Sequence, residues 1–211
     1  MKTLTKLLAL PLVLFVSGEA QAQEFYWAFQ YGMSAPMGDT KTFTPGSHWR
    51  NFGVDGRYVL KPNLTVGFHV GWSVMNDITA EVVSVNGTAE VTNVNGADIG
   101  GVYFRYLNSF PVMANIHYYF GKARGTRPYI GINAGPQAVE RRVEVGLFQI
   151  NDNNWHFGFA PEAGVVLPFD RYMKGLVNVK YNHALAAGEF GQSYQYWTFN
   201  IGIAWATSGG F

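Results

Sequence analysis

Four charged residues stand out because they interrupt segments that otherwise alternate large apolar and small polar residues. They are two acids and two bases: Asp55, Arg57, Glu162 and Lys180. Opposite charges neutralise one another when a fold brings them together, and a buried charge without a partner is strongly destabilising. Two roles follow from this chemistry: a charged constriction that gates a narrow passage, or an ion-pair network that fills a protein interior.

A second set of residues has the types needed for covalent catalysis. His183, Ser193 and Glu189 could form a nucleophilic triad, in which the acid orients the base and the base activates the hydroxyl. Loops are naturally rich in such residues, and no tight motif supports the trio. The five His residues lack the close spacing of metal ligands, and no phosphate-binding glycine loop is present. We therefore predict no enzymatic activity, no metal and no cofactor.

The elements that must position these residues are segments of alternating polarity. In residues 64–74 and 197–205, a large apolar residue occupies every second position. A period of two predicts β-strands, because successive side chains leave opposite faces of the pleat. We predict eight strands in all, over residues 25–35, 49–60, 64–74, 103–120, 127–143, 155–167, 172–182 and 194–206.

Each predicted strand has one apolar and one polar face, which two architectures would use in opposite ways. A soluble sandwich or lipocalin-like barrel would bury the apolar face, whereas an outer-membrane barrel turns it towards lipid. The mid-strand charges on the polar face, and the aromatic residues near strand ends, favour the membrane barrel. Charged residues make up 14% of the chain, against about 25% in typical soluble domains. We therefore predict an all-β, closed, antiparallel, up-and-down transmembrane β-barrel of about eight strands.

The connections between the predicted strands support this choice, because short and long ones alternate. Residues 61–63, 121–126 and 168–171 are short and turn-like, whereas residues 36–48, 75–102, 144–154 and 183–193 are long. Outer-membrane barrels have short periplasmic turns and long extracellular loops. The 75–102 loop contains the pairs Asn86-Gly87 and Asn95-Gly96, which favour tight hairpins, so we expect a small β-hairpin there.

The N-terminal residues have the pattern of a secretory signal peptide. Lys2 and Lys6 precede an apolar run over residues 7–16, and a small-x-small cleavage site ends at Ala22. We predict a signal peptide over residues 1–22, a mature start at Gln23 and one barrel domain over residues 23–211. The signal segment holds two of the 15 basic and one of the 14 acidic residues, so the mature chain has no net charge. This balance argues against nucleic acid as a partner.

Four segments resemble the small outer-membrane β-barrel superfamily of OmpA-like, OmpX-like and OmpW-like porin-fold proteins. They cover residues 52–58, 64–68, 115–120 and 127–135. The resemblance implies an eight-stranded barrel in a bacterial outer membrane, with both termini in the periplasm and the long loops outside the cell. It also implies contact with outer-membrane lipid and lipopolysaccharide, and with the barrel-assembly machinery during biogenesis. We expect no periplasmic peptidoglycan-binding domain of the kind that full-length OmpA-like proteins carry, because the predicted barrel takes up residues 23–211.

In that setting, Arg141 and Arg142 are candidates for contact with lipopolysaccharide phosphates, although a solvated strand end would explain them equally well. Eight strands enclose a lumen that side chains just fill, which favours the plugging role for the four charges. We therefore predict a non-enzymatic protein with an envelope-structural or surface-interaction role. The alternatives are a narrow channel for small or apolar solutes, as in OmpW-like proteins, and a lipid-modifying enzyme.

Overall fold

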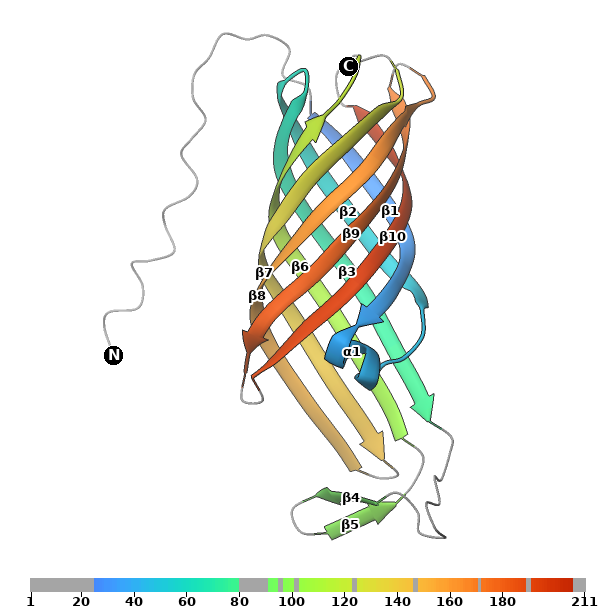
Figure 1. The fold of residues 1–211 in the computed structure, drawn as a ribbon, viewed down its shortest axis with the longest axis vertical. Helices are drawn as coiled ribbons and strands as arrows, with labels where there is room; N and C mark the ends of the chain where they lie inside the picture. The colour runs from blue at the N-terminus through green and yellow to red at the C-terminus, as the bar shows by residue number, and fades with distance from the viewer. Residues whose placement is uncertain are drawn as a thin grey trace, which may run out of the picture.

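The computed structural model describes residues 25–79, 91–94, 97–100, 103–122, 125–145, 148–170, 172–188 and 191–206. The predicted signal peptide with its Ala22–Gln23 cleavage site, the Asn86-Gly87 pair and Glu189 lie outside these residues. Eight antiparallel strands close into one barrel (Figure 1). The strands are β1 (Phe25–Met37), β2 (His48–Lys61), β3 (Leu64–Thr79), β6 (Tyr103–Tyr119), β7 (Arg127–Val145), β8 (Phe148–Pro168), β9 (Met173–Ala187) and β10 (Gln192–Ala206).

Each strand of the barrel pairs with its sequence neighbour, and β1 also pairs with β10 to close the cylinder. This up-and-down order confirms the predicted fold class. One end of the barrel, here called the short-turn end, holds the start of β1, the end of β10 and the connections β2–β3, β6–β7 and β8–β9. In the last of these, the backbone N–H groups of Met173 and Tyr172 donate to the Asp170 carboxylate and lower its pKa. The opposite end is called the long-loop end.

The two faces of each strand have the predicted polarity, with the apolar side chains outside. Ile201 on β10 is 65% exposed, whereas its neighbour Asn200 is 4% exposed and points into the barrel. The outer surface carries a continuous belt of exposed apolar side chains, which a soluble monomer does not present. The belt includes Phe29, Phe52, Phe68, Val70, Trp72, Val112, Ile116, Ile130, Ile132, Val177, Phe199, Ile201 and Ile203. The apolar faces of the strands therefore face lipid.

Aromatic rings form a row near the long-loop end of this belt, here called the outer aromatic row. Tyr31, Phe52, Trp72 and Phe110 lie on four neighbouring strands, with successive ring centroids 5.1, 6.1 and 5.7 Å apart. Near the short-turn end, Phe29 stacks on Trp205 at 4.7 Å. Such rows are typical of the two interfaces of a bilayer, where amphipathic rings are most stable.

At the long-loop end the strands extend further than the sequence predicts. β7 continues to Val145 and β8 begins at Phe148, so most of the predicted 144–154 loop is paired strand. Likewise, β3 continues to Thr79, and β9 and β10 take up most of the predicted 183–193 loop. The prediction was wrong here because it ended each strand where the apolar alternation ends. The backbone pairing continues beyond that point through polar residues, and Figure 1 shows β7 and β8 reaching past the ends of β9 and β10.

Two small elements lie at the long-loop end. β4 (Val91–Val94) and β5 (Ala97–Gly100) pair as a hairpin within the predicted 75–102 loop, as expected, and the Asn95-Gly96 pair between them lies outside the described residues. The helix α1 (Gly38–Phe43), in the predicted 36–48 loop, was not predicted. It has six residues and no side-chain N-cap, so tertiary contacts must stabilise it. Among the described residues, no helix is both long and apolar enough to cross a bilayer.

Candidate functional site: the charged interior of the barrel

The four charged residues singled out above meet inside the barrel. Asp55 and Arg57 enter from β2, and Glu162 and Lys180 enter from the opposite wall, where they are direct cross-strand neighbours on β8 and β9. All four side chains are 0–2% exposed. Asp55 and Arg57 are two residues apart on one strand, so their side chains point to the same face of the sheet.

The contacts among these four residues form a closed set of opposite charges, here called the ion-pair network. Arg57 Nη2 lies 2.5 Å from Asp55 Oδ2 and 3.3 Å from Glu162 Oε1. Lys180 Nζ lies 3.7 Å from Asp55 Oδ1 and 3.5 Å from Glu162 Oε2. Each base therefore contacts both acids, and the network bridges the lumen from wall to wall.

Four further side chains complete the coordination of the two carboxylates. His69 Nδ1 lies 2.5 Å from Asp55 Oδ1, and His117 Nε2 lies 3.2 Å from Glu162 Oε2. Tyr129 donates its hydroxyl to Glu162 Oε1 at 2.5 Å, and Asn133 donates its amide to Glu162 Oε2 at 3.1 Å. Each carboxylate thus accepts several hydrogen bonds in addition to its ion pairs, which is the condition under which buried charges are tolerated.

A chain of side-chain hydrogen bonds runs from the long-loop half of the lumen to this network. Each amide in it accepts from the preceding residue and donates to the next, and the members come from β3, β2, β10, β9 and β1. The chain starts at Ser73, passes through Asn51, Asn200, Asn178 and Gln30, and ends on Asp55. These amides and the coordinating Tyr129 were not predicted as site residues, although their inward position follows from the strand period.

Glycines on intervening strands allow some of these contacts. Gly32 of β1 pairs with both Asn51 and Asn200, which hydrogen bond directly across it. A Cβ at Gly32 would lie 2.5 Å from Asn200 Oδ1. Gly131 of β7 separates His117 from Glu162 in the same way, and a Cβ there would lie 2.2 Å from His117 Cδ2.

Gly131→Ala is therefore expected to push the His117 ring away from Glu162 and to lower the free energy of unfolding by about 1–3 kcal/mol, the usual cost of overpacking. Denaturant unfolding of the barrel in lipid vesicles, followed by tryptophan fluorescence, measures the change. Gly125→Ala is the matched control, because a Cβ there meets its nearest atom only at 3.8 Å. An equal loss of stability in both variants would contradict the proposed close approach.

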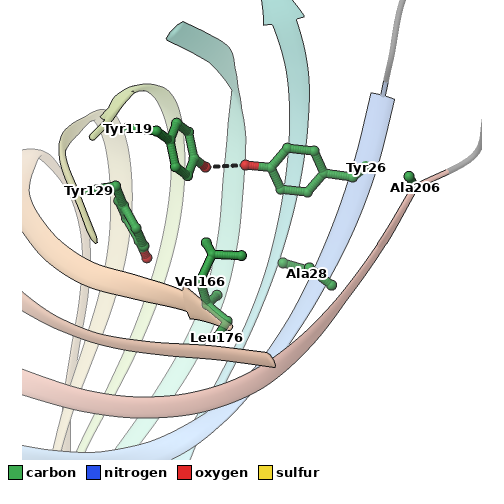
Figure 2. Close-up of a cluster of buried hydrophobic side chains, with 8 residues drawn as sticks. Tyr26, Ala28, Tyr119, Tyr129, Val166, Leu176 and Ala206 are labelled. Carbon is green, nitrogen blue, oxygen red and sulfur yellow. Dashed lines mark hydrogen bonds between the residues drawn. The ribbon is translucent and has the colours of Figure 1, made fainter. Parts of the chain in front are cut away.

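Apolar clusters lie on both sides of the network along the lumen. The cluster at the short-turn end contains Tyr26, Tyr119, Tyr129, Val166 and Leu176 (Figure 2). Figure 2 shows the Tyr26 and Tyr119 hydroxyls hydrogen bonded across the lumen, and Arg57 Nη1 donates to the same Tyr119 oxygen at 2.8 Å. The short-turn cluster is therefore joined to the ion-pair network.

The second cluster lies at the long-loop end and contains Met75, Leu107, Val139, Tyr194 and Tyr196. Phe43 of α1 packs against it from the mouth of the barrel, and the Gln195 backbone N–H donates to Thr40 Oγ1 of α1 at 2.9 Å. Between this cluster and the ion-pair network lies a small polar cavity with room for about one water molecule. Gln30, Asn51, His69, Ser73, Lys180, Asn182, Tyr196, Thr198 and Asn200 are among its lining residues.

The two arginines proposed to bind lipopolysaccharide lie on different sides of the wall. Arg141 points inward, with its guanidinium 4.3 Å from the centre of the Phe43 ring. Arg142 points outward, 4.8 Å from the Tyr106 ring centre, with its Nε 3.4 Å from a Glu144 carboxylate oxygen. Only Arg142 is thus placed on the outer surface.

Two of the three residues considered for catalysis lie on the wall of the barrel. His183 is on β9, with its ring centre 5.0 Å from that of Phe159 and 6.3 Å from that of Tyr181. Phe159 and Tyr181 belong to the outer face, so His183 packs among outward-facing rings. Ser193 lies on β10, and Glu189 is outside the described residues.

No protein-family model and no curated protein sequence matches this chain. Its structure is similar to that of Ail, the attachment invasion locus protein of Yersinia pestis, in complex with the heparin analogue sucrose octasulfate. The identity is 12%, the TM-score is 0.50, and the match covers 87% of this chain and 98% of that one. Neisserial surface protein A matches with 12% identity and a TM-score of 0.48, over 87% of this chain and 96% of that one.

The N-terminal β-barrel domain of Pseudomonas aeruginosa OprF matches with 11% identity and a TM-score of 0.47, over 86% of this chain and 96% of that one. Together with the eight-stranded closed topology, the similarity to Ail shows that the chain has the fold of small outer-membrane β-barrels. The predicted resemblance is therefore confirmed at the level of the fold, and the fold supports an outer-membrane location.

Proposed function

We propose that this chain is a non-enzymatic, integral outer-membrane barrel with a closed interior, which serves envelope structure or surface interaction. The filled lumen is the observation that carries the proposal. Two apolar clusters and the ion-pair network between them occupy the barrel along its axis. A solute would have to displace paired charges that are 0–2% exposed, and breaking one such pair costs several kcal/mol.

In this proposal, the long-loop end faces the outside of the cell and the short-turn end faces the periplasm. The strands that extend past the outer aromatic row supply the exposed surface. α1 covers part of the mouth, because Thr40 and Thr44 are buried and Phe43 packs on the long-loop cluster. Interaction with other molecules would therefore take place on the extended strands and their connections.

Planar-bilayer recording tests the closed interior. We expect the purified barrel to insert without giving a stable single-channel conductance, because buried ion pairs and two apolar clusters stand in the path of a solute, and the polar cavity between them has room for about one water molecule. A heat-modifiability gel shift of the same sample shows that the barrel is folded. Stable conductance from folded protein would overturn the proposal in favour of a narrow channel for small solutes.

Lipopolysaccharide binding is the part of the proposal that concerns Arg142. Arg142→Ala should weaken binding to lipopolysaccharide vesicles by about 1 kcal/mol, roughly fivefold in Kd, because one surface cation is lost. Arg141→Ala is the matched control, because Arg141 stacks on Phe43 inside the mouth. Vesicle co-sedimentation at fixed salt measures both. Equal weakening by the two variants would argue against a specific contact at Arg142.

A lipid-modifying activity is the competing class of function. Incubation of the folded barrel with radiolabelled phospholipid and lipopolysaccharide should give no hydrolysis and no acyl transfer. Activity that is lost in His183→Ala would overturn the non-enzymatic proposal.

A further inference from the structure

A patch on the inner wall carries buried polar atoms that have no hydrogen-bond partner among the described residues. They are Thr65 Oγ1, both side-chain amide atoms of Asn115, His117 Nδ1 and Asn133 Oδ1. The four residues are 0–5% exposed. Buried polar groups in folded proteins are almost always hydrogen bonded, to protein or to ordered water. Five such atoms in one place therefore indicate a ligand.

The strand register brings these residues together. Thr65 of β3 is the direct cross-strand neighbour of His117 on β6, and Asn115 of β6 is the direct neighbour of Asn133 on β7. Asn115 and His117 are two residues apart on one strand, so both point into the lumen. Directly paired side chains on one face have Cβ atoms about 4.5–5.5 Å apart. The four side chains thus form one continuous patch across three strands.

We propose that this patch binds ordered water inside the barrel. Its unpartnered atoms include both acceptors and a donor, and water satisfies both kinds. The Asn133 carbonyl oxygen and the Thr65 hydroxyl accept, and the Asn115 amide nitrogen donates. When His117 donates from Nε2 to Glu162, its Nδ1 is an acceptor.

A cation is a poorer match for this patch than water is. The four neighbouring charges of the ion-pair network, two acids and two bases, cancel, so no net negative charge favours a cation. In the part of the chain that the structure describes, no group of three His, Asp, Glu or Cys residues could hold a metal ion.

The proposed water lies behind two of the side chains that contact Glu162, Asn133 and His117. Asn133 Nδ2 and His117 Nε2 both contact Glu162 Oε2, at 3.1 and 3.2 Å. The other polar atom of each of these two side chains is one of the unpartnered five. Glu162 sets the orientation of the Asn133 amide and the tautomer of His117, because a carboxylate only accepts hydrogen bonds. Water bound behind these two side chains satisfies the remaining polar atom of each, so it supports the donors of the ion-pair network whether or not the barrel conducts.

Water-edited solid-state NMR of the wild-type protein in lipid bilayers tests the site. We expect magnetisation from water to reach the Asn115 side-chain amide several-fold faster than that of Asn178. Asn178 is the matched control, because it is also a buried luminal amide, but its Nδ2 donates to Gln30 at 2.7 Å and its Oδ1 accepts from Asn200 at 2.8 Å. Equally slow transfer to both amides would overturn the proposal.

A pair of near-isosteric variants provides a second test. Thr65→Val removes one partner of the water without changing the charge, so transfer to Asn115 should fall in this variant. Thr198→Val is its control, because the Thr198 hydroxyl accepts from Asn182 and Asn200 instead. An unchanged Asn115 signal in Thr65→Val would overturn the proposal. So would a loss of that signal when sodium replaces choline in the buffer, because the patch would then hold a cation.

Discussion

Glu162→Leu is expected to lower the free energy of unfolding by about 3–5 kcal/mol, because it leaves Lys180 and Arg57 buried without one of their two acids. Tyr129, His117 and Asn133 also lose their shared acceptor. Equilibrium unfolding in urea, in vesicles of fixed composition, measures the loss.

The matched control for this variant is Glu144→Gln. Glu144 pairs with Arg142 at 3.4 Å, but both side chains are about one-third exposed, so its loss should cost less than about 1 kcal/mol. Glu162→Leu combined with Lys180→Met should recover part of the loss, because an acid and a base leave together. Equal effects of Glu162→Leu and Glu144→Gln would show that the interior charges are solvated and that the lumen is open to water.

The second large effect is expected on the outer face. Ile201→Arg should lower the free energy of unfolding by about 2–4 kcal/mol, the cost of a cation near the middle of the bilayer. Ile201 is 65% exposed and lies midway along the lipid-facing side of β10, between Trp197 and Trp205. The same vesicle unfolding assay measures the change.

Ile78→Arg is the matched control for this variant. Ile78 is also an exposed outward residue, but it lies near the end of β3, six residues beyond Trp72 of the outer aromatic row. Arginine near or beyond the interface costs about 0–1 kcal/mol. A similar cost at the two positions, or a protein that stays monomeric and folded without detergent or lipid, would count against a membrane barrel.

The membrane-spanning part of the fold could be predicted from residue types alone. A period of two specifies which side chains share a face, so Asp55, Arg57, Glu162 and Lys180 fall on the polar faces of their strands, and an apolar face turned to lipid leaves those polar faces inside. It could not specify that Arg57 contacts Glu162, because that distance depends on how far the strands are staggered around the closed barrel. Side chains on opposite walls meet only once the stagger is set.

Two other features could not be predicted, for different physical reasons. At the long-loop end of β8, outward positions such as Asn151 and Asn153 are polar, so the sequence there no longer alternates between apolar and polar residues. The backbone pairing with β7 nevertheless continues, and the sequence pattern therefore does not reveal the strand in this region. The helix α1 is too short and too poorly capped to show a period or a start signal. It forms because Phe43 packs on the long-loop cluster and Thr40 accepts a hydrogen bond from the Gln195 backbone. These contacts join residues far apart in the sequence, so the residues around α1 alone do not predict them.

The hydrogen-bonded amide chain has a consequence for folding. Two of its links, Asn51 to Asn200 and Gln30 to Asn178, join residues 149 and 148 positions apart and cross the junction between the first and last strands. Neither link can form before that junction closes, and each joins residues far apart in the sequence. We therefore expect both hydrogen bonds to form together, in the step in which β10 pairs with β1 and closes the barrel. Folding should be slow and concerted, as for other topologies dominated by distant contacts.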